Sequence, residues 1–381
     1  MAKPAGPGCN MRCEYCYYLG KAGLFPQGLW RMPQDLLESY IAQRLEASPG
    51  PTTHFEWHGG EPTLLGVDYF RTIVRLQKKH RPPGRRVTNG IQTNGLLLDD
   101  EWAVFLKEES FSVGLSMDGP AEIHDAYRKT SAGHATHARV TGAYRLLSGH
   151  DVFCNILCVL HAGNAVEPDR VYNFFRGLGV RYLQFLPLVL RAEGSGVREP
   201  TASAESIGDF LCRVFDRWME EDVGRMVIQT FDEALRPLYG VPHALCIHRE
   251  TCGDVAVLEH DGGFYACDHF VDPEHLVGNL RERSLSEMIR DPLMERFGKA
   301  KAEALPRACR RCDVLSACNG GCPKDRFCAA PDGTPGVSYL CAAYRRFFRH
   351  SRPGLYRLAQ HMKLGRSLRS FDGKAALSAC P

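Results

Sequence analysis

The chain has 381 residues, a formal net charge of +3, 44% hydrophobic residues and 24% charged residues. These values are ordinary for a folded globular protein and exclude a fibrous or disordered chain, and without a run of 18 apolar residues no membrane-spanning helix is predicted. No apolar signal segment precedes Cys9, so we expect the 16 cysteines in the reducing cytoplasm, where clustered cysteines favour metal chemistry over disulfides.

The first predicted element is a short strand, and Cys9, Cys13 and Cys16 follow it with C-x3-C-x2-C spacing. Three thiolates can hold three irons of a cubane iron–sulfur cluster. The fourth iron then keeps an open position, as catalytic metal sites do, and S-adenosylmethionine fills that position in radical chemistry. Half of a zinc site and buried apolar cysteines are the alternatives. A zinc site would need a fourth ligand nearby, and no Cys or His follows before His54.

Strands and helices then alternate along the chain, which is typical of a parallel α/β sheet. We expect further strands over residues 53–57, 87–92, 111–116, 152–160 and 180–186. We expect helices over residues 36–45, 67–80, 99–109, 137–147, 168–178 and 204–222, with Asp99 or Asp100 capping the third.

Candidate chemical residues follow four of the predicted strands, namely Cys9, Gly60, Asn94 and Ser116. Active sites of barrel-like α/β folds lie at this carboxyl edge. Gly60 belongs to Gly59-Gly60-Glu61-Pro62, where glycines allow the backbone to approach a ligand closely and an acid is at hand for an ammonium group. An ordinary turn is the alternative for this segment.

Beyond residue 230 the periodicity weakens and cysteines return, which indicates a domain boundary there. The spacing Cys-x2-Cys within this group also occurs in zinc ribbons, so zinc and iron–sulfur clusters both stay open at this point. The end of the chain is basic, and we expect a solvated helix face there rather than a nucleic-acid site.

These segments together resemble known families. The cysteine loop followed by Tyr17, and the Gly59–Pro62 segment, resemble the radical SAM superfamily, and the later cysteines resemble its SPASM domain. The chain from about residue 3 to about residue 348 resembles the anaerobic sulfatase-maturating enzymes, most specifically in Cys267-Asp268-His269-Phe270-Val271 and in Cys318-Asn319-Gly320-Gly321-Cys322-Pro323-Lys324-Asp325-Arg326-Phe327.

The resemblance implies an α/β fold, a partial (β/α)6 TIM-like radical SAM barrel over residues 1–230. A SPASM-type iron–sulfur cluster domain over 231–350 and a basic C-terminal helix or tail over 351–381 follow. The implied reaction oxidises a Cys or Ser of an unfolded sulfatase segment to Cα-formylglycine, through a 5′-deoxyadenosyl radical that removes hydrogen from Cβ. The implied cofactors are S-adenosylmethionine and three 4Fe–4S clusters, and the implied partners are the peptide and a flavodoxin or ferredoxin, without nucleic acid or membrane.

Site residues carry over from the resemblance by position. Asp268 is the implied base, and we expect a raised pKa for this carboxyl beside a low-dielectric cluster. The residues assigned to the cofactor are Tyr15, Gly60, Glu61, Ser116 and Arg128, and those assigned to the substrate are Tyr18 and His58. Besides Cys9, Cys13 and Cys16, the implied cluster ligands are Cys246, Cys252, Cys267 and Cys322 in one set, and Cys309, Cys312, Cys318 and Cys341 in another.

Two alternatives stay open in the sequence. A different radical SAM/SPASM enzyme that crosslinks or epimerises a ribosomal peptide would carry the same cluster motifs, and a non-catalytic zinc-binding adaptor would carry the same cysteines. One position departs from the resemblance: His58 stands where the family usually has Gln near its substrate, which adds a titrating group.

Overall fold

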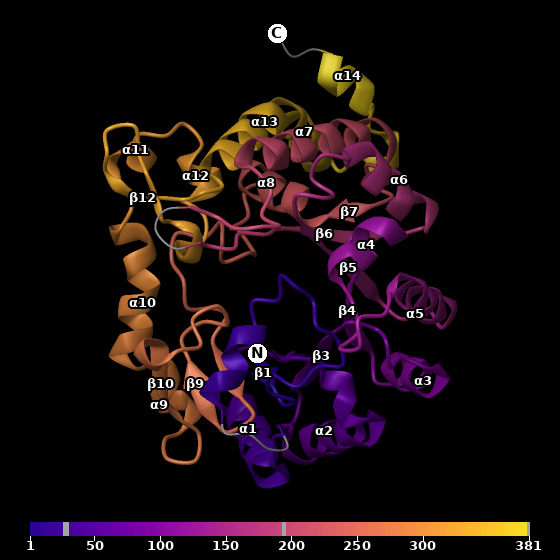
Figure 1. Ribbon diagram of the computed structural model, residues 1–381, viewed down its shortest axis with the longest axis vertical. Helices are drawn as coiled ribbons and strands as arrows, with labels where there is room; N and C mark the ends of the chain where they lie inside the picture. Colours follow the sequence, from indigo (N-terminus) through magenta and orange to yellow (C-terminus); the bar gives the residue numbers. More distant parts are fainter. Residues whose placement is uncertain (26–29, 193–195, 379–381) are drawn as a thin grey trace. The chain divides into compact units, whose positions relative to one another are not determined.

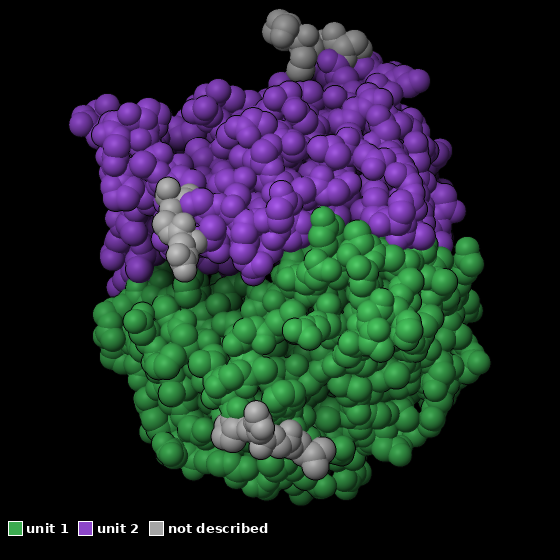
Figure 2. Space-filling model, viewed as in Figure 1, with its two compact units in different colours: residues 1–117, 124–155, 253–298 green, residues 118–123, 156–252, 299–381 purple. Residues whose placement is uncertain are grey.

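The computed structural model describes residues 1–25, 30–192 and 196–378, and they divide into two compact units. Unit 1 comprises residues 1–117, 124–155 and 253–298, and unit 2 comprises residues 118–123, 156–252 and 299–381 (Figure 2). Both units therefore draw on both halves of the chain. The domain boundaries expected from the sequence, near residues 230 and 350, divide the chain by its expected chemistry rather than by compactness. These boundaries stay a prediction.

The strands of unit 1 lie in the order β10-β9-β8-β1-β2-β3-β4. Their bounds are β1 (Ala2–Lys3), β2 (Thr52–Trp57), β3 (Arg86–Thr93), β4 (Phe111–Ser116), β8 (Val257–Glu259), β9 (Gly263–Tyr265) and β10 (Leu276–Asn279). β8, β1, β2, β3 and β4 run parallel, whereas β9 and β10 pair antiparallel. The loops that follow β1, β2, β3 and β4 therefore leave the sheet at one edge, where the predicted site residues lie.

The helices of unit 1 cover this sheet. They are η1 (Leu19–Leu24), α1 (Gln34–Ala47), η2 (Pro62–Leu65), α2 (Val67–His80), α3 (Asp100–Glu108), α5 (His137–Gly149), η3 (Pro273–His275) and α9 (Leu285–Ile289), while α4 (Ala121–Tyr127) and α10 (Pro292–Glu303) each contribute to both units. The predicted helices in this region are confirmed. The Asp99 cap is also confirmed, because its carboxylate accepts from the backbone N–H of Trp102 at 3.0 Å.

Aromatic packing forms the core between α1, α2 and the sheet. Phe55 and Trp57 lie two residues apart on β2, so their side chains share one face of the sheet. Their rings stack with centroids 5.7 Å apart. Tyr40 of α1 and Phe70 of α2 contact Trp57 edge-on. This rigid layer fixes the carboxyl end of β2, from which the segment Gly59–Pro62 continues.

Unit 2 contains the parallel pairs β5–β6 and β6–β7. The bounds are β5 (Cys154–Leu160), whose first two residues belong to unit 1, β6 (Tyr182–Pro187), β7 (Val227–Ile228), α6 (Pro168–Gly177), α7 (Ala204–Glu221), α8 (Gln229–Tyr239), α11 (Arg307–Arg310), α12 (Leu315–Cys318), η4 (Pro323–Asp325), β11 (Cys328–Ala329), β12 (Pro335–Val337), α13 (Cys341–Lys363), η5 (Leu368–Ser370) and α14 (Gly373–Ser378). The strands and helices predicted between residues 156 and 222 are confirmed.

The basic end of the chain forms a helix whose basic side chains are solvated, as expected, since Arg345, Arg346, Arg349 and Arg352 are all exposed, while its opposite, apolar face is packed. α13 begins at Cys341, ten residues before the expected start, because its apolar stripe already begins at Ala343 and Phe347. It lies against α7 and α8 (Figure 1). Its cations face acids of unit 2, as in the pairing of Arg349 with Asp313 at 2.8 Å. No described helix is long and apolar enough to cross a membrane.

Candidate active site

The three N-terminal cysteines lie on a loop that leaves β1 and is fixed by its backbone. Arg12 N–H donates to Lys129 C=O at 2.9 Å, and Glu14 N–H donates to Tyr127 C=O at 3.2 Å. Burial raises the pKa of the Cys9 thiol to about 12, and the charges of Glu61, Cys13 and Cys16 act in the same direction. The three thiols are thus close enough to affect one another, and a positively charged iron centre would favour their deprotonation.

The segment Gly59–Pro62 supports this cysteine loop by direct backbone contact. Gly60 N–H donates to Gly6 C=O and Glu61 N–H donates to Gly8 C=O, both at 2.7 Å. A Cβ atom on Gly60 would lie 2.1 Å from the carbonyl oxygen of Gly8. Glycine is therefore required here, because only its missing side chain lets the two segments approach.

The Glu61 carboxylate connects two segments of unit 1, the turn after β2 and the end of β3. Its Oε1 accepts from Thr63 N at 3.0 Å, Thr63 Oγ1 at 2.6 Å and Thr93 Oγ1 at 2.7 Å, and its Oε2 accepts from Asn94 N at 2.7 Å. Only 1% of Glu61 is exposed, and burial raises its pKa. The carboxylate therefore holds the strand ends together, while its expected contact with the cofactor stays a prediction.

The remaining residues assigned to the cofactor occur in two pairs. Gln92 Nε2 donates to Ser116 Oγ at 3.1 Å, which joins the ends of β3 and β4. The Arg128 guanidinium lies 5.4 Å from the ring centre of Tyr15, over its face. Both pairs present polar groups on elements that adjoin the cysteine loop, and their roles toward S-adenosylmethionine stay predictions.

Asn94 is a further polar residue at this edge, and it contacts the cysteine loop directly. Its Nδ2 donates to Asn10 Oδ1 at 2.7 Å and lies 3.8 Å from Cys9 Sγ. Sequence reasoning placed Asn94 at a strand end without giving it a role. The structure assigns it to orienting the first cysteine.

Asp268 is the centre of a buried polar cluster in unit 1. Its carboxylate forms an ion pair with Lys3, whose side chain is completely buried. Tyr17 OH donates to Asp268 Oδ2 at 2.7 Å. Since β1 lies between β8 and β2, the short first strand brings Lys3 to the segment that follows β9.

The expected pKa shift of Asp268 is wrong in direction. Burial by itself would raise the pKa, but the charges of Lys3, His58 and His269 together outweigh burial and hold the pKa well below its usual range. The carboxyl is therefore ionised, which is the form that a general base needs. The sequence-based expectation considered only the low dielectric and not the lysine.

His58 lies within the electrostatic reach of this centre. Its Nδ1 accepts from Gly59 N–H at 2.8 Å, so the other ring nitrogen carries the proton in the neutral form. Burial lowers the pKa of His58, and the Asp268 carboxylate opposes that shift. His58 therefore lies near Asp268, and its sequence-based assignment to the substrate stays a prediction.

A second carboxylate, that of Glu259, is close to Lys3. Glu259 and Lys3 are register neighbours on the parallel strands β8 and β1. Tyr18 OH donates to Glu259 Oε1, and the Lys3 ammonium lies 3.7 Å from the ring centre of Tyr18. Burial raises the pKa of Glu259 to about 7, while the charge of Lys3 lowers it. Tyr18, assigned to the substrate from the sequence, is thus bound to a buried acid.

Four later cysteines line a single pocket of unit 2. Its lining comprises Cys309, Cys312, Val314, Leu315, Cys318, Gly320, Ser338, Cys341 and Arg345. Burial raises the pKa of Cys318 to about 12, and charges on Cys341, Cys309 and Cys312 add to the effect. A thiolate set that faces one enclosed space fits an iron–sulfur cluster, and these are the four residues predicted for the second auxiliary set.

Three members of the other set also lie in unit 2. Charges on Cys252, Cys246 and Cys322 all act on the buried ammonium of Lys301, so these three thiols are within electrostatic reach of one cation. Cys267, the predicted fourth member, belongs to unit 1, and its place in the set stays a prediction. Within residues 1–25, 30–192 and 196–378, no three His, Cys, Asp or Glu side chains form a site for a single metal ion.

Comparisons with known proteins agree with this geometry. Residues 4–175 match the family model of the radical SAM superfamily, and residues 246–313 match an iron–sulfur cluster-binding domain. A serine-type anaerobic sulfatase-maturating enzyme of Bacteroides thetaiotaomicron is 41% identical over 369 residues, which covers 93% of this chain and 89% of the relative. The chain belongs to the anaerobic sulfatase-maturating enzymes.

Other sulfatase-maturating relatives also match this chain over nearly its whole length. A cysteine-type enzyme of Clostridium perfringens is 33% identical over 95% of this chain and 98% of its own. The solved structure of native anSMEcpe with bound AdoMet and Kp18Cys peptide has a TM-score of 0.86 at 33% identity, covering 94% of this chain and 98% of that one. The α/β radical SAM fold with a SPASM domain is therefore confirmed.

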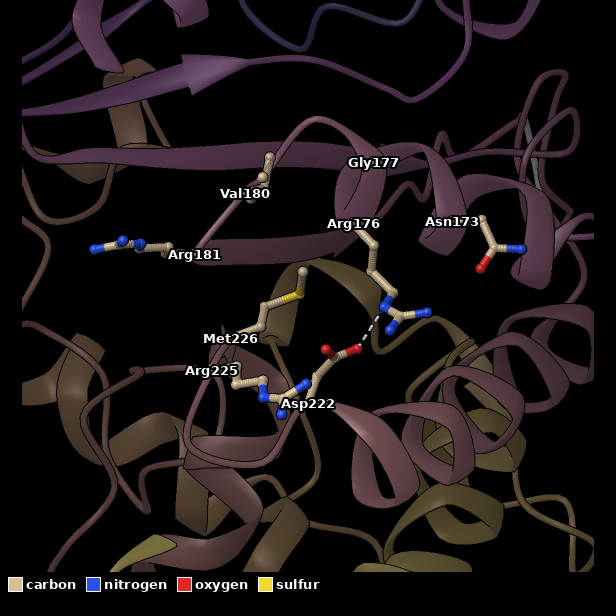
Figure 3. A pocket seen from close by; sticks show the side chains of 9 residues that line it. Asn173, Arg176, Gly177, Val180, Arg181, Asp222, Arg225 and Met226 are labelled. Carbon is tan, nitrogen blue, oxygen red and sulfur yellow. Dashed lines mark ion pairs between the residues drawn. The ribbon is translucent and has the colours of Figure 1, made fainter. Parts of the chain in front are cut away.

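Another pocket of unit 2 has a different character from the sulfatase-maturating site. It encloses about 470 Å³ beside the amino ends of β6 and β7. Figure 3 shows Arg176, Arg181 and Arg225 along it, with Arg176 bound to Asp222 at 2.7 Å. No cysteine lines it. Parallel-sheet enzymes place their chemistry at the opposite, carboxyl ends of the strands, so this pocket is not a candidate for the radical reaction.

Sequence reasoning missed three residues of the Asp268 cluster. Tyr17 was noted only as an aromatic residue after the cysteines, and Lys3 and Glu259 were not selected. A lysine in a two-residue strand just before Cys9 was the one signal available for Lys3. Glu259 gave none, because the weak periodicity after residue 230 concealed the strand that carries it.

Proposed function

We propose that this protein oxidises a cysteine or serine side chain in a sulfatase polypeptide to Cα-formylglycine. The observation that carries the proposal is Asp268, an ionised and nearly buried carboxylate that directly follows a cysteine of the cluster domain and is paired with Lys3. A base in this position can accept the thiol or hydroxyl proton of a substrate as its Cβ is oxidised.

The donor sets fit the expected cofactors. Cys9, Cys13 and Cys16 would hold a 4Fe–4S cluster that binds S-adenosylmethionine, with Tyr15, Gly60, Glu61, Ser116 and Arg128 around the nucleoside and methionine. The two later sets of four cysteines would hold the auxiliary 4Fe–4S clusters. When bound, these groups supply a 5′-deoxyadenosyl radical that removes hydrogen from the substrate Cβ, and an acceptor for the electron that leaves the substrate.

The protein's own residues prepare the proton transfer. Lys3 keeps Asp268 charged, and the hydroxyl of Tyr17 fixes the orientation of Oδ2. Because the centre is nearly dry, these contacts are stronger than they would be in water. His58 and Tyr18 lie beside this centre and are the residues we assign to contact with the peptide.

The finer predictions on partners and location belong to this proposal. The substrate is an unfolded segment of the Cys/Ser-x-Pro-x-Arg type, since the side chain to be oxidised must reach the buried Asp268. Flavodoxin or ferredoxin supplies electrons, neither nucleic acid nor membrane takes part, and the reaction occurs in the cytoplasm. Cys-type and Ser-type relatives are similar to this chain at 33% and 41% identity, so both substrates need testing.

The test is anaerobic incubation of the reconstituted protein with S-adenosylmethionine, reductant and matched peptides that contain Cys-x-Pro-x-Arg or Ser-x-Pro-x-Arg. Mass spectrometry should show formylglycine in at least one peptide, with 5′-deoxyadenosine. Asp268→Asn should abolish formylglycine, whereas Asp272→Asn should retain it, because Asp272 caps the turn η3 and contacts His275 within that turn, and asparagine caps equally well. Deoxyadenosine without any change in either peptide would contradict the proposal.

A further inference from the structure

Lys301 is a buried cation without a carboxylate partner. Only 1% of its surface is exposed. Its ammonium donates to the carbonyl oxygens of Cys246 at 2.6 Å and Ile247 at 3.1 Å, and also to that of Arg249. No carboxylate of the described residues pairs with it, although burying an uncompensated charge is costly. An anion is therefore needed nearby.

Arg326 is a second cation in the same region, and it organises the loop between Cys318 and Cys322. Its guanidinium donates to the carbonyl oxygens of Gly320 at 2.9 Å and Asn319 at 2.8 Å. Asn319, Gly320 and Gly321 all have positive φ values, which turns the carbonyls of this loop inward. A Cβ atom on Gly320 would lie 2.6 Å from Arg326 Nη2, so glycine makes room for the guanidinium.

The position of Arg326 between the two cysteine sets follows from this loop. Cys318 is assigned to one auxiliary cluster and Cys322 to the other. The guanidinium also donates to the carbonyl of Lys301 at 2.5 Å, which connects the two cations. Burial lowers the pKa of Arg326, and the charges of four cysteines oppose this shift. Two of them, Cys252 and Cys322, belong to the first set, and the other two, Cys309 and Cys318, belong to the second. The cysteine charges that act most strongly on Lys301 are those of Cys252, Cys246 and Cys322, all of the first set.

We propose that Arg326 is a fixed positive charge shared by the two auxiliary cluster sites, that Lys301 is a second one serving the first site alone, and that they raise the reduction potentials of the clusters. Adding one electron makes a thiolate-bound cluster one charge more negative. A nearby cation stabilises that reduced form more than the oxidised form, and net charge and hydrogen bonding are the means by which a protein sets such potentials. Arginine suits the role because it keeps its proton.

The inference rests on the proposed assignment of the cysteines to clusters. The experiment therefore uses the full chain with Cys9, Cys13 and Cys16 replaced by alanine, so that only auxiliary clusters remain. Iron and sulfide are measured first, and an EPR-monitored redox titration then follows the two clusters. If this parent protein lacks the iron of two clusters, the assignment of the cysteines to clusters is refuted. If it holds both clusters, the assignment stands and the role of the two cations can be tested by itself.

Four variants of this parent decide the proposal. In Arg326→Gln both midpoint potentials should fall with iron retained, in Lys301→Gln only one should fall, and Arg326→Lys should stay close to the parent. Arg85→Gln is the matched control, because Arg85 also donates to backbone carbonyls, those of Ser48 and Gly50, but belongs to unit 1 and is far in sequence from every cysteine of the two sets. Its potentials should not change.

Several results would overturn the proposal. Unchanged potentials in an iron-loaded Arg326→Gln protein would do so, and equal shifts of both clusters in Lys301→Gln would remove the distinction between the two cations. If Arg326→Gln loses iron, the Arg326→Lys variant distinguishes a role for the charge from a role in holding the loop. Retention of both clusters with near-parent potentials supports a role for charge, whereas loss of the clusters there too would make Arg326 only a scaffold for the loop.

Discussion

Lys3 and Asp268 form an ion pair in which the lysine side chain is completely buried and the aspartate side chain is 12% exposed. The lysine comes from the two-residue strand β1 and the aspartate from the segment after β9. Each residue determines the charge of the other, because a buried ion pair that loses one partner leaves an uncompensated charge. Three predictions concern this pair and the side chains around it.

Replacing Lys3 by methionine should destabilise the protein and remove formylglycine formation. Breaking a buried pair from one side costs about 3–5 kcal/mol, because the remaining carboxylate is left unpaired. Removing both charges in Lys3→Met/Asp268→Asn should recover much of that stability, although not the activity. Urea unfolding of the two single variants and the double variant would measure the coupling free energy between the two side chains. Additive losses of stability would show that this coupling is absent.

Tyr17→Phe should reduce the rate of peptide oxidation about tenfold, because a hydrogen bond to a charged group contributes about 1.5–3 kcal/mol and the bond to Asp268 is lost. Formation of 5′-deoxyadenosine without peptide should stay unchanged, since the radical is generated elsewhere. Tyr172→Phe is the paired comparison, because the hydroxyl of Tyr172 also donates to a carboxylate at 2.7 Å, that of Asp222 in unit 2, and not to Asp268. Equal losses in the two variants would argue against a specific role for the Asp268 contact.

Glu259 should produce a pH dependence near neutrality. Burial raises its pKa to about 7, so this group is mostly neutral below that pH and becomes charged above it. Once charged, it competes with Asp268 for Lys3, which raises the pKa of Asp268 and makes it a stronger base. The groups facing Glu259 are Lys3, Tyr18, Asp268 and Asp261.

The rate of peptide oxidation should therefore rise as pH increases through about 7, and Glu259→Gln should remove this step. The profile is measured under saturating S-adenosylmethionine with deoxyadenosine counted in parallel, so that a general loss of radical formation is recognised. A Glu259→Gln profile identical to that of the parent would show that the titrating group lies elsewhere.

Much of the fold and of the cluster sites was predictable from the sequence, because both depend on short-range patterns. Alternating apolar strands and amphipathic helices predicted the elements up to residue 222, the spacing of Cys9, Cys13 and Cys16 indicated the first thiol set, and the resemblance assigned the two later sets. The four cysteines that the resemblance assigns to one set line one pocket, and their role as cluster ligands stays a prediction. The start of α13 was missed, because its basic residues concealed the apolar stripe that begins at Ala343.

The Asp268 cluster was not predictable, because it depends on how β1 pairs. This strand has two residues, yet it joins β2 to β8 and places Lys3 beside Glu259. Nothing in the local sequence indicates that a lysine near the start of the chain is completely buried. The pKa of Asp268 was expected to rise for the same reason, since its opposing charge comes from a distant segment.

The contact between Gly60 and the cysteine loop leads to a final prediction about cofactor loading. A Cβ atom on Gly60 would lie 2.1 Å from the carbonyl oxygen of Gly8, the residue before Cys9. Backbone cannot move aside as a flexible side chain can, so Gly60→Ala must displace the loop that carries the first thiol. Gly142→Ala is the control, because nothing lies within 4 Å of the added atom and alanine is favourable in the helix α5.

In Gly60→Ala we expect loss of about one cluster's iron after anaerobic reconstitution, together with loss of S-adenosylmethionine cleavage, because the open-site cluster requires all three thiols. The clusters of the two later cysteine sets should remain, so the visible absorption falls without vanishing. Gly142→Ala should match the parent in iron and in cleavage. A Gly60→Ala protein with full iron and normal deoxyadenosine production would show that the loop tolerates displacement, and that the close approach of these two segments does not hold the cluster in place.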